Sequence, residues 1–205
     1  MTETAELLVA TNNAGKAREI SELLSGLPLR LHLLSDFPAV PEAEETGETF
    51  EENAVIKAVQ YSAAAGLLTL ADDSGLEVEA LGGQPGVHSA RYAGPGATDA
   101  ERIRLLLRTL DATGDAERRA RFVCVLALAG PRDDEAVRVF SGACSGSIAR
   151  EPRGGGGFGY DPVFIPEGHT QTFAELPPEV KNSISHRAKA LAAFRTYVEE
   201  RFKAA

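Results

Sequence analysis

Hydrophobic positions change their spacing along the first part of the chain. Residues 7–10 form a short apolar run typical of a buried strand, and the polar, turn-forming stretch 11–15 ends it. Apolar residues then recur three and four positions apart over residues 17–24, which predicts a helix. A second strand is predicted over residues 29–34. The chain therefore begins as strand, loop, helix and strand.

The same change of period recurs further along the chain. After the acidic loop 41–47, the pattern predicts a helix from about residue 49 to residue 65. The apolar run 67–71 predicts a strand that breaks at Asp72-Asp73-Ser74-Gly75 before alternation resumes. An amphipathic helix is predicted over residues 99–110. Two carboxylates are thus expected at a strand bend.

The second half of the chain favours a hairpin followed by a helix. Residues 122–129 and 136–148 have the composition of two long strands, and the turn-rich segment 130–134 joins them as in an antiparallel pair. The last helix is predicted over about residues 186–202, with Ser185 as its N-cap. We expect an α/β fold in which helices flank a mixed sheet, with the whole chain forming one domain.

Composition and charge restrict the classes of partner. The 205 residues carry a formal net charge of −9, so a broad basic surface for nucleic acid is not expected. No apolar run approaches the roughly 20 residues of a membrane helix, and the first residues lack a signal-peptide pattern. We therefore expect a cytoplasmic protein with no membrane partner. Cys124 and Cys144 are expected to be reduced and partly buried thiols.

The loop from Thr11 to Lys16 joins a predicted strand to a helix N-terminus. Free backbone N–H groups and the positive end of the helix dipole favour an anion there, and Lys16 adds a full charge. The spacing of a Walker P-loop is absent, which excludes the usual P-loop ATPase interpretation. A plain capped turn is the alternative, because Asn and Gly suit turns for conformational reasons alone.

Asp72 and Asp73 are adjacent carboxylates that repel one another unless positive charge lies beside them. A hard divalent cation bound through oxygens is one solution and a neighbouring lysine is another, while a solvated turn is the alternative. The acidic run 42–48 could supply a further oxygen ligand, although most of its carboxylates are expected to be solvated. Lys57 lies on the inner stripe of its predicted helix, where snorkelling alone would also explain it.

Two later segments carry groups suited to a nucleobase. The stretch from Phe158 to Asp161 follows four glycines and combines a stacking ring, a glycine that permits close approach and a carboxylate acceptor. A tight turn with an exposed aromatic is its alternative interpretation. Ser185-His186-Arg187 offers hydrogen-bond donors at a helix start, or else forms an ordinary N-cap with surface charges.

Taken in order, these segments resemble the inosine triphosphate pyrophosphatase family, whose members hydrolyse dITP, ITP and XTP. The resemblance covers nearly the whole chain. Its motifs are Thr11 to Lys16, Glu44 to Lys57, Ala71 to Leu76, Leu81 to Gly86 with Ser89 to Tyr92, Gly156 to Pro162, and Ser185-His186-Arg187. Two positions depart from the family pattern, where glycine is frequent: Asn12 in the first loop and Ala188 after the last motif. Both residues suit their local structure, so we expect them to be tolerated.

The resemblance implies a fold, a reaction and a set of site residues. The fold would be an elongated mixed sheet in two lobes around an active-site cleft, usually in a homodimer that takes small-molecule purine nucleoside triphosphates and Mg²⁺. Asp73 would be the general base and, with Glu44, a metal ligand, with Glu45 as the other possible ligand. The substrate contacts implied are Thr11, Asn12, Asn13, Ala14, Gly15 and Lys16 at the phosphates, Lys57 and Lys181 beside them, Ser74, and Phe158, Gly159, Tyr160, Asp161, His186 and Arg187 at the base.

The implied specificity depends on the 6-oxo group of the purine. His186 and Arg187 would donate to this oxygen, and donors left unpaired by the adenine amino group would disfavour ATP. Two other functions stay open at this point: a nucleotide sensor without turnover, and a pyrophosphatase of the related septum-inhibition group that acts on modified pyrimidines.

Overall fold

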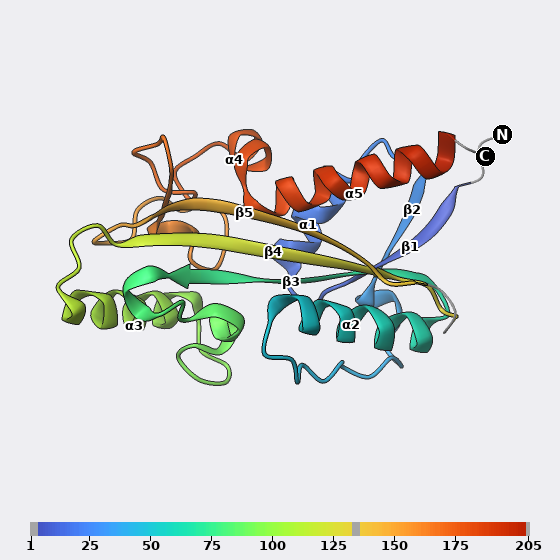
Figure 1. The fold of residues 1–205 in the computed structure, drawn as a ribbon, viewed down its shortest axis with the longest axis horizontal. Coiled ribbons are helices and arrows are strands. Elements are labelled where there is room, and N and C mark those ends of the chain that lie inside the picture. The colour runs from blue at the N-terminus through green and yellow to red at the C-terminus, as the bar shows by residue number, and fades with distance from the viewer. Residues whose placement is uncertain (1–3, 133–135, 204–205) are drawn as a thin grey trace. The chain divides into compact units, whose positions relative to one another are not determined.

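The computed structural model of the protein describes residues 4–132 and 136–203. Within these residues, six strands form one sheet in the order β2-β1-β3-β4-β5-β6 (Figure 1). β1 is parallel to β2 and β3, whereas β5 and β6 are antiparallel, so the predicted α/β fold with a mixed sheet is confirmed. The strands are β1 Ala5–Ala10, β2 Leu29–Leu33, β3 Leu68–Val78, β4 Arg119–Ala129, β5 Arg138–Ile148 and β6 Phe164–Pro166. The helices are α1 Ala14–Leu23, α2 Phe50–Ala65, α3 Asp99–Thr113, α4 Pro178–Ile184 and α5 His186–Lys203.

The chain divides into two compact units. Unit 1 draws on the described residues within Met1–Asp73, Cys124–Gly142 and Arg187–Ala205. Unit 2 comprises Ser74–Val123 and Ala143–His186. Each unit therefore combines segments that are distant in the sequence.

The core of unit 1 lies between its sheet and two helices. Leu7 of β1 and Leu70 of β3 pack in one cluster with Ile20 of α1 and Phe194 of α5. Helix α2 covers the opposite face of these strands (Figure 1). Alternate side chains of a strand point to opposite faces, so a sheet covered by helices on both faces needs apolar residues at nearly every strand position. The apolar run predicted at residues 7–10 is buried for this reason.

Local signals explain why α2 forms where the pattern predicted it. The Thr49 side chain accepts a hydrogen bond from the Glu52 N–H, and the Glu52 side chain accepts in return from the Thr49 N–H. This capping box satisfies donors at the start of the helix. Gly66 ends the helix in the left-handed conformation, with φ of +69°. The bounds of the helix therefore set the position of Lys57 along β3, next to Asp72 and Asp73.

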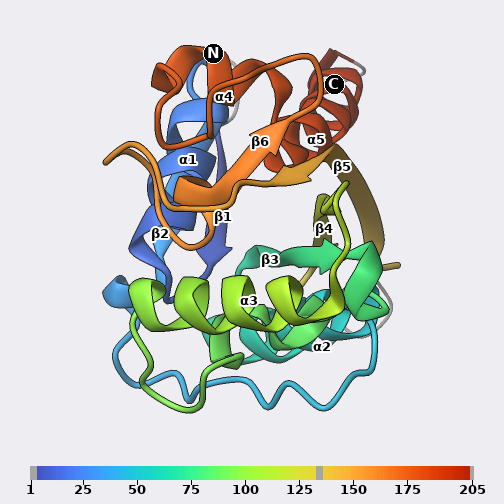
Figure 2. The same ribbon diagram turned by 90° about the vertical axis from the view of Figure 1, so that its left-hand side faces the viewer.

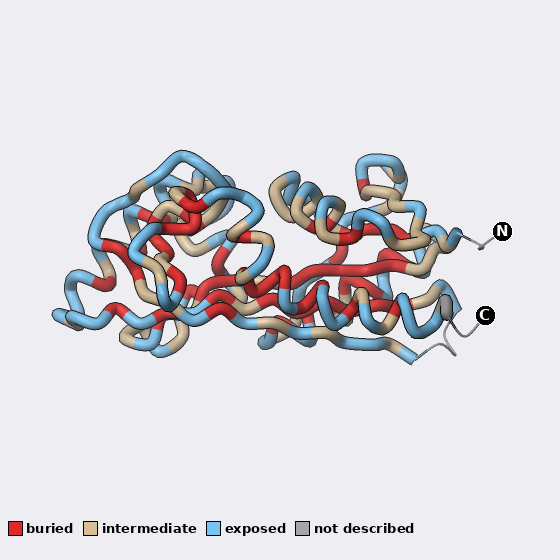
Figure 3. The backbone as a smooth tube through the Cα atoms, turned by 90° about the horizontal axis from the view of Figure 1, so that it is seen from above, coloured by how far each residue is buried: buried red, intermediate tan, exposed pale blue. Residues whose placement is uncertain are grey.

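The core of unit 2 is built around α3. Ile103 and Leu106 of α3 pack with Leu76 of β3 and Phe122 of β4. Figure 2 shows α3 beside this end of β3. Figure 3 shows that buried residues concentrate along the strands, while exposed residues cover the outer sides of helices and loops. The amphipathic pattern predicted for residues 99–110 is thus confirmed, and the helix continues to Thr113.

Some of the predicted elements differ from those of the structure. The predicted break after residue 71 is wrong, because β3 runs without interruption from Leu68 to Val78. The sequence pattern also missed α4 and β6, which are short. Of the predicted turn 130–134, residues 133 and 134 lie outside the described residues.

Cys124 and Cys144 are buried free thiols, as predicted. In the part of the chain described here, no helix combines the length and apolar character needed to cross a bilayer.

Candidate active site

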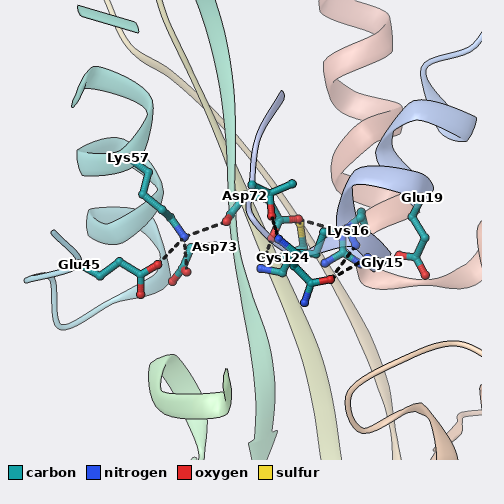
Figure 4. Close-up of polar contacts among 11 residues, drawn as sticks. Gly15, Lys16, Glu19, Glu45, Lys57, Asp72, Asp73 and Cys124 are labelled. Carbon is teal, nitrogen blue, oxygen red and sulfur yellow. Dashed lines mark hydrogen bonds and ion pairs between the residues drawn. The ribbon is translucent and has the colours of Figure 1, made fainter. Parts of the chain in front are cut away.

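The register of the sheet brings the first predicted loop to the two aspartates. Ala10, the last residue of β1, is paired with Ala71 of β3. The chain therefore leaves β1 beside Asp72 and Asp73. Because neighbouring strand residues point to opposite faces, the two carboxylates lie on opposite sides of β3 (Figure 4). This divergence explains how two adjacent acidic residues occupy the middle of one strand.

The loop after β1 forms a capped turn. The Asn13 side-chain oxygen accepts hydrogen bonds from the N–H groups of Gly15, at 2.9 Å, and Lys16, at 3.1 Å. The Thr11 hydroxyl accepts from the Asn13 N–H at 3.1 Å. Asn12 donates to the Glu42 carboxylate at 3.4 Å, and its φ is not in the left-handed region, so this position does not need glycine. The Asn13 side chain therefore occupies the N–H groups of Gly15 and Lys16, two of the backbone donors that were predicted to bind an anion.

Asp72 is the centre of a buried charged cluster. Its Oδ1 lies 2.6 Å from Lys16 Nζ, and its Oδ2 accepts from Arg187 Nε at 2.8 Å. The Cys124 thiol also contacts this Oδ2, at 3.4 Å. Burial opposes ionisation of Asp72, but Arg187 and Lys16 hold its pKa well below the usual range. Asp72 is therefore a carboxylate that neutralises and orients two cations.

Lys57 joins a second group of carboxylates on the other side of β3. Its ammonium donates to Asp73 Oδ1 at 2.7 Å, to the Asp72 carbonyl at 2.9 Å and to Glu45 Oε1 at 3.1 Å (Figure 4). Burial disfavours the charged lysine, yet Asp73 and Glu45 raise the pKa of Lys57 above its usual value. The interpretation of Lys57 as a snorkelling surface lysine is wrong, because the residue is buried and all three donors are engaged.

The free oxygen of Asp73 distinguishes this carboxylate from that of Asp72. Within the described residues, Asp73 Oδ2 is buried and has no hydrogen-bond partner. Burial raises the pKa of Asp73, and the neighbouring Lys57 offsets this only in part. A buried carboxylate oxygen without a partner is costly, so it marks a place where a further donor or a cation would be stabilising.

The structure separates the two candidate glutamates of the acidic loop. Both are exposed, but the Glu45 carboxylate reaches Lys57, whereas only the N–H of Glu44 is engaged among the described residues, with the Gln60 side chain at 3.2 Å. Over residues 4–132 and 136–203, no three His, Cys, Asp or Glu side chains converge as a complete cation site. A metal held by one or two protein carboxylates would therefore complete its shell with substrate oxygens or water.

The predicted base-binding segment lies in unit 2. Asp161 accepts a hydrogen bond from the Phe158 N–H at 2.8 Å and forms an ion pair with Lys181, and both charged side chains are buried. The Lys181 ammonium lies 4.9 Å from the centre of the Phe158 ring, a cation–π contact. The Tyr160 hydroxyl donates to the Ser89 carbonyl, and burial raises its pKa. Phe158, Asp161 and Lys181 are thus brought together as one group.

The remaining candidate substrate-binding residues are Ser74 on β3 and the pair His186 and Arg187 at the start of α5. Ser74 is half-buried on β3, and the ring of His186 stacks on Phe122 with centroids 4.6 Å apart. The Arg187 side chain instead points into unit 1, where it bonds Asp72 and Glu19. The structure therefore places His186 and Arg187 in different surroundings.

Sequence reasoning missed two contacts of the Asp72 cluster. Glu19 pairs with Arg187 through its carboxylate. It lies three positions after Lys16 on α1, so helical spacing alone could have indicated that the two side chains share a face. No local signal indicated Cys124, because a thiol in an apolar strand has the pattern of an ordinary core residue.

Comparisons with known proteins place the chain among relatives over nearly its whole length. A family model described as the Ham1 family matches residues 7–197. The chain is 49% identical over 197 residues to a Coxiella burnetii protein named dITP/XTP pyrophosphatase, covering 96% of this chain and 98% of that one. It is 52% identical over 195 residues to a Geobacillus kaustophilus protein of the same name, covering 95% of each.

Solved structures show the same fold. A HAM1 protein from Coxiella burnetii superimposes with a TM-score of 0.88 at 48% identity, over 96% of this chain and 99% of that one. A Mycobacterium abscessus structure described as nucleoside-triphosphatase and dITP/XTP pyrophosphatase gives a TM-score of 0.73 at 47% identity, over 92% and 98% of the two chains. The family resemblance inferred from the motifs is confirmed, and the chain belongs to the Ham1 family.

Proposed function

We propose that this protein is a nucleoside-triphosphate pyrophosphatase that hydrolyses dITP, XTP and ITP to the monophosphate and pyrophosphate. The observation that carries the proposal is the buried Asp73 oxygen, which has no hydrogen-bond partner in the described residues and lies on a carboxylate bonded to Lys57. The names of two near-full-length relatives, dITP/XTP pyrophosphatase, support dITP and XTP as substrates. We propose that both units belong to one enzyme domain, because the family model spans residues of both.

The donor set of unit 1 fits Mg²⁺. Asp73 Oδ2 and the Glu45 carboxylate are hard oxygen donors, and Mg²⁺ is commonly held by one or two carboxylates together with substrate phosphates. We propose that Asp73 and Glu45 hold the metal, with Glu44 as the other possible ligand. When bound, the cation would neutralise charge on the polyphosphate.

We propose that Asp73 also acts as the general base. Its Oδ2 would accept a proton from a water that attacks the α-phosphorus, so that an oxygen–phosphorus bond forms and the bond to the pyrophosphate oxygen breaks. Asp73 is better placed as a proton acceptor than Asp72, because Lys16 and Arg187 engage both Asp72 oxygens whereas Asp73 Oδ2 has no partner within the described residues. Lys16 and Lys57 would stabilise charge on the departing pyrophosphate, and the loop Thr11 to Gly15 would bind phosphate oxygens.

Residues of unit 2 are proposed to bind the purine. Phe158 would stack on the base, and Asp161 with the backbone of Gly159 and Tyr160 would hold it. Lys181 and Ser74 would contact the substrate. His186 is proposed to donate to the 6-oxo oxygen. Arg187 keeps the same proposed role, although its side chain is bonded to Asp72 and Glu19 in this structure.

Pyrophosphate release from a panel of triphosphates tests the proposal. We expect Mg²⁺-dependent release from dITP, ITP and XTP and little from ATP, because an amino group at position 6 leaves the oxo-directed donors unpaired. Equal rates on dITP and ATP would refute this account of specificity. Binding of dITP without turnover would identify a sensor, and preference for a modified pyrimidine triphosphate would identify the septum-inhibition type of pyrophosphatase.

Two further properties belong to the proposal. We propose a homodimer, which sedimentation of the purified protein at several concentrations would test. We also propose the cytoplasm as its location, because the nucleotide pool that it would act on is found there. Fractionation of cells that express the tagged full chain would test this.

A further inference from the structure

Phe158 lies between two glycines in the left-handed region. The φ angles are +69° at Gly157 and +62° at Gly159. A Cβ on Gly157 would also come within 2.0 Å of an Asp161 oxygen, so a larger residue does not fit there. Glycine on both sides leaves the backbone intrinsically flexible. Other contacts therefore have to set the direction of the Phe158 ring.

Two carboxylates hold the peptide planes on either side of Phe158. The Phe158 N–H donates to Asp161 Oδ2 at 2.8 Å, and the Gly159 N–H donates to Asp99 Oδ2 at 2.7 Å. A planar peptide on each side of a residue defines both of its backbone torsions. Together the two bonds restrain φ and ψ of Phe158, and with them the direction of its Cα–Cβ bond. The ring is held where the Lys181 ammonium faces it.

Asp99 is itself oriented by a neighbour. It is the first residue of α3, and its Oδ1 forms an ion pair with Arg102 one turn later. Arg102 also donates to the carbonyl oxygens of Ala90, at 2.9 Å, and Ala97, at 2.6 Å. The guanidinium is thus anchored at several points, which leaves the other Asp99 oxygen directed at Gly159.

The start of α3 does not require this contact. Thr98 and Glu101 form a capping box, in which the Thr98 hydroxyl accepts from the Glu101 N–H and Glu101 accepts from the Thr98 N–H. That device satisfies the helix terminus without Asp99 Oδ2. The bond from Asp99 instead crosses 60 positions of sequence to the loop that carries Phe158.

We propose that Asp99 is a positioning residue for nucleobase binding. It holds the backbone of the 157–159 loop so that the Phe158 ring is presented to the purine. This inference rests on the proposed function, from which the stacking role of Phe158 comes. Asp99 is not among the residues proposed there to bind the phosphates or the metal. Charge-assisted bonds from backbone N–H groups to a carboxylate are among the stronger hydrogen bonds, which suits a contact that restrains a glycine loop.

A fluorescence experiment tests whether Asp99 restrains the 157–159 loop, and it requires no measurement of enzyme activity. The chain contains no tryptophan, so Phe158→Trp introduces a single reporter in the loop. In that background we expect Asp99→Ala to lower the tryptophan anisotropy and to increase acrylamide quenching. Arg104→Ala is the control, because it removes an exposed charged side chain from the same helix and leaves the capping box of Thr98 and Glu101 intact. Unchanged anisotropy and quenching in Asp99→Ala would overturn the proposal.

Kinetics test the consequence for substrate in the full chain with Phe158 intact. We expect Asp99→Ala to raise the KM for dITP by about tenfold with kcat changed by less than about twofold, as for a lost binding contact. Inorganic tripolyphosphate, which has no base, should keep its inhibition constant as a competitor. Asp99→Asn retains an acceptor oxygen and should rescue most of the KM. Arg104→Ala should leave both constants unchanged.

The outcomes separate the two proposals. A parallel rise in the dITP KM and the tripolyphosphate inhibition constant would indicate a general structural role and would overturn the positioning of the base. Normal dITP kinetics in Asp99→Ala, with an active wild type, would refute the role of Asp99 alone. A wild type that releases no pyrophosphate from dITP would refute the proposed function, while the anisotropy would still report whether Asp99 restrains the loop.

Discussion

Arg187 and Asp72 form a buried ion pair although they are 115 positions apart in the sequence. The two side chains are 2% and 0% exposed, and Lys16 takes the second carboxylate oxygen of Asp72 at 2.6 Å. One anion thus serves two cations. Because a buried charge is stable only when it is paired, the three side chains depend on one another.

Loss of the Asp72 charge should destabilise the fold. Asp72→Asn leaves the Arg187 and Lys16 cations without their shared anion, and we expect the free energy of unfolding to fall by about 3–5 kcal/mol. Urea unfolding followed by circular dichroism measures this. Glu117→Gln is the control, because its ion pair with Arg119 is exposed and is expected to contribute at most about 1 kcal/mol. Equal stability of the two variants would contradict the prediction.

Asp73→Asn should remove activity while the protein remains folded. An amide of the same shape cannot accept the proton of the attacking water, so we expect turnover of dITP to fall by about 10²–10⁴-fold. Pyrophosphate release and thermal unfolding measured on the same preparation separate activity from stability. Glu51→Gln, an exposed change on α2, is the control and should retain wild-type turnover. Near-normal turnover of Asp73→Asn would exclude its role as the base.

The two glutamates should differ in their effect on metal dependence. Both residues are exposed, but the Glu45 carboxylate forms an ion pair with Lys57 beside Asp73, whereas no ion pair or hydrogen bond of the Glu44 carboxylate is found within the described residues. We expect Glu45→Gln to raise the Mg²⁺ concentration for half-maximal activity by about tenfold or more, because a hard anionic ligand is lost. Glu44→Gln should change it by less than about twofold. The reverse order in a Mg²⁺ titration would assign the ligand to Glu44.

Cys124 should be unreactive in the folded protein. Burial, and then the neighbouring Asp72, raise the pKa of this thiol well above its usual value, and only the thiolate is nucleophilic. At pH 8.5 we expect iodoacetamide to leave Cys124 unlabelled in the native protein and to alkylate it in guanidinium chloride, as read by mass spectrometry. Rapid labelling of the native protein would contradict the burial.

The same shift predicts a pH effect on stability. Above about pH 8.5 the unfolded thiol loses its proton while the folded thiol keeps it. The folded state then binds more protons, so this contribution to stability decreases as the pH rises. We expect Cys124→Ala to show a smaller loss of stability than wild type between pH 8 and pH 10 in urea unfolding. Identical slopes would contradict this contribution.

The sequence by itself determined the elements whose signals are local. Helix α2 begins at the capping box of Thr49 and Glu52 and ends at Gly66, and these residues act within one or two turns of the chain. The strand, loop and helix around Lys16 were predicted for the same reason. Contiguous motifs also carried the family resemblance, which the comparisons confirm.

Tertiary structure alone decided how the charged residues are paired. The pattern predicted a break at Asp72 and Asp73 because the apolar run of the strand ends there. The strand continues because cations from positions 16, 57 and 187 reach these carboxylates from both sides. Tertiary structure also decided that Lys57 pairs with Glu45. It likewise brought the Gly159 N–H within hydrogen-bonding distance of Asp99. Such contacts join positions far apart in the chain, so no local period or propensity encodes them.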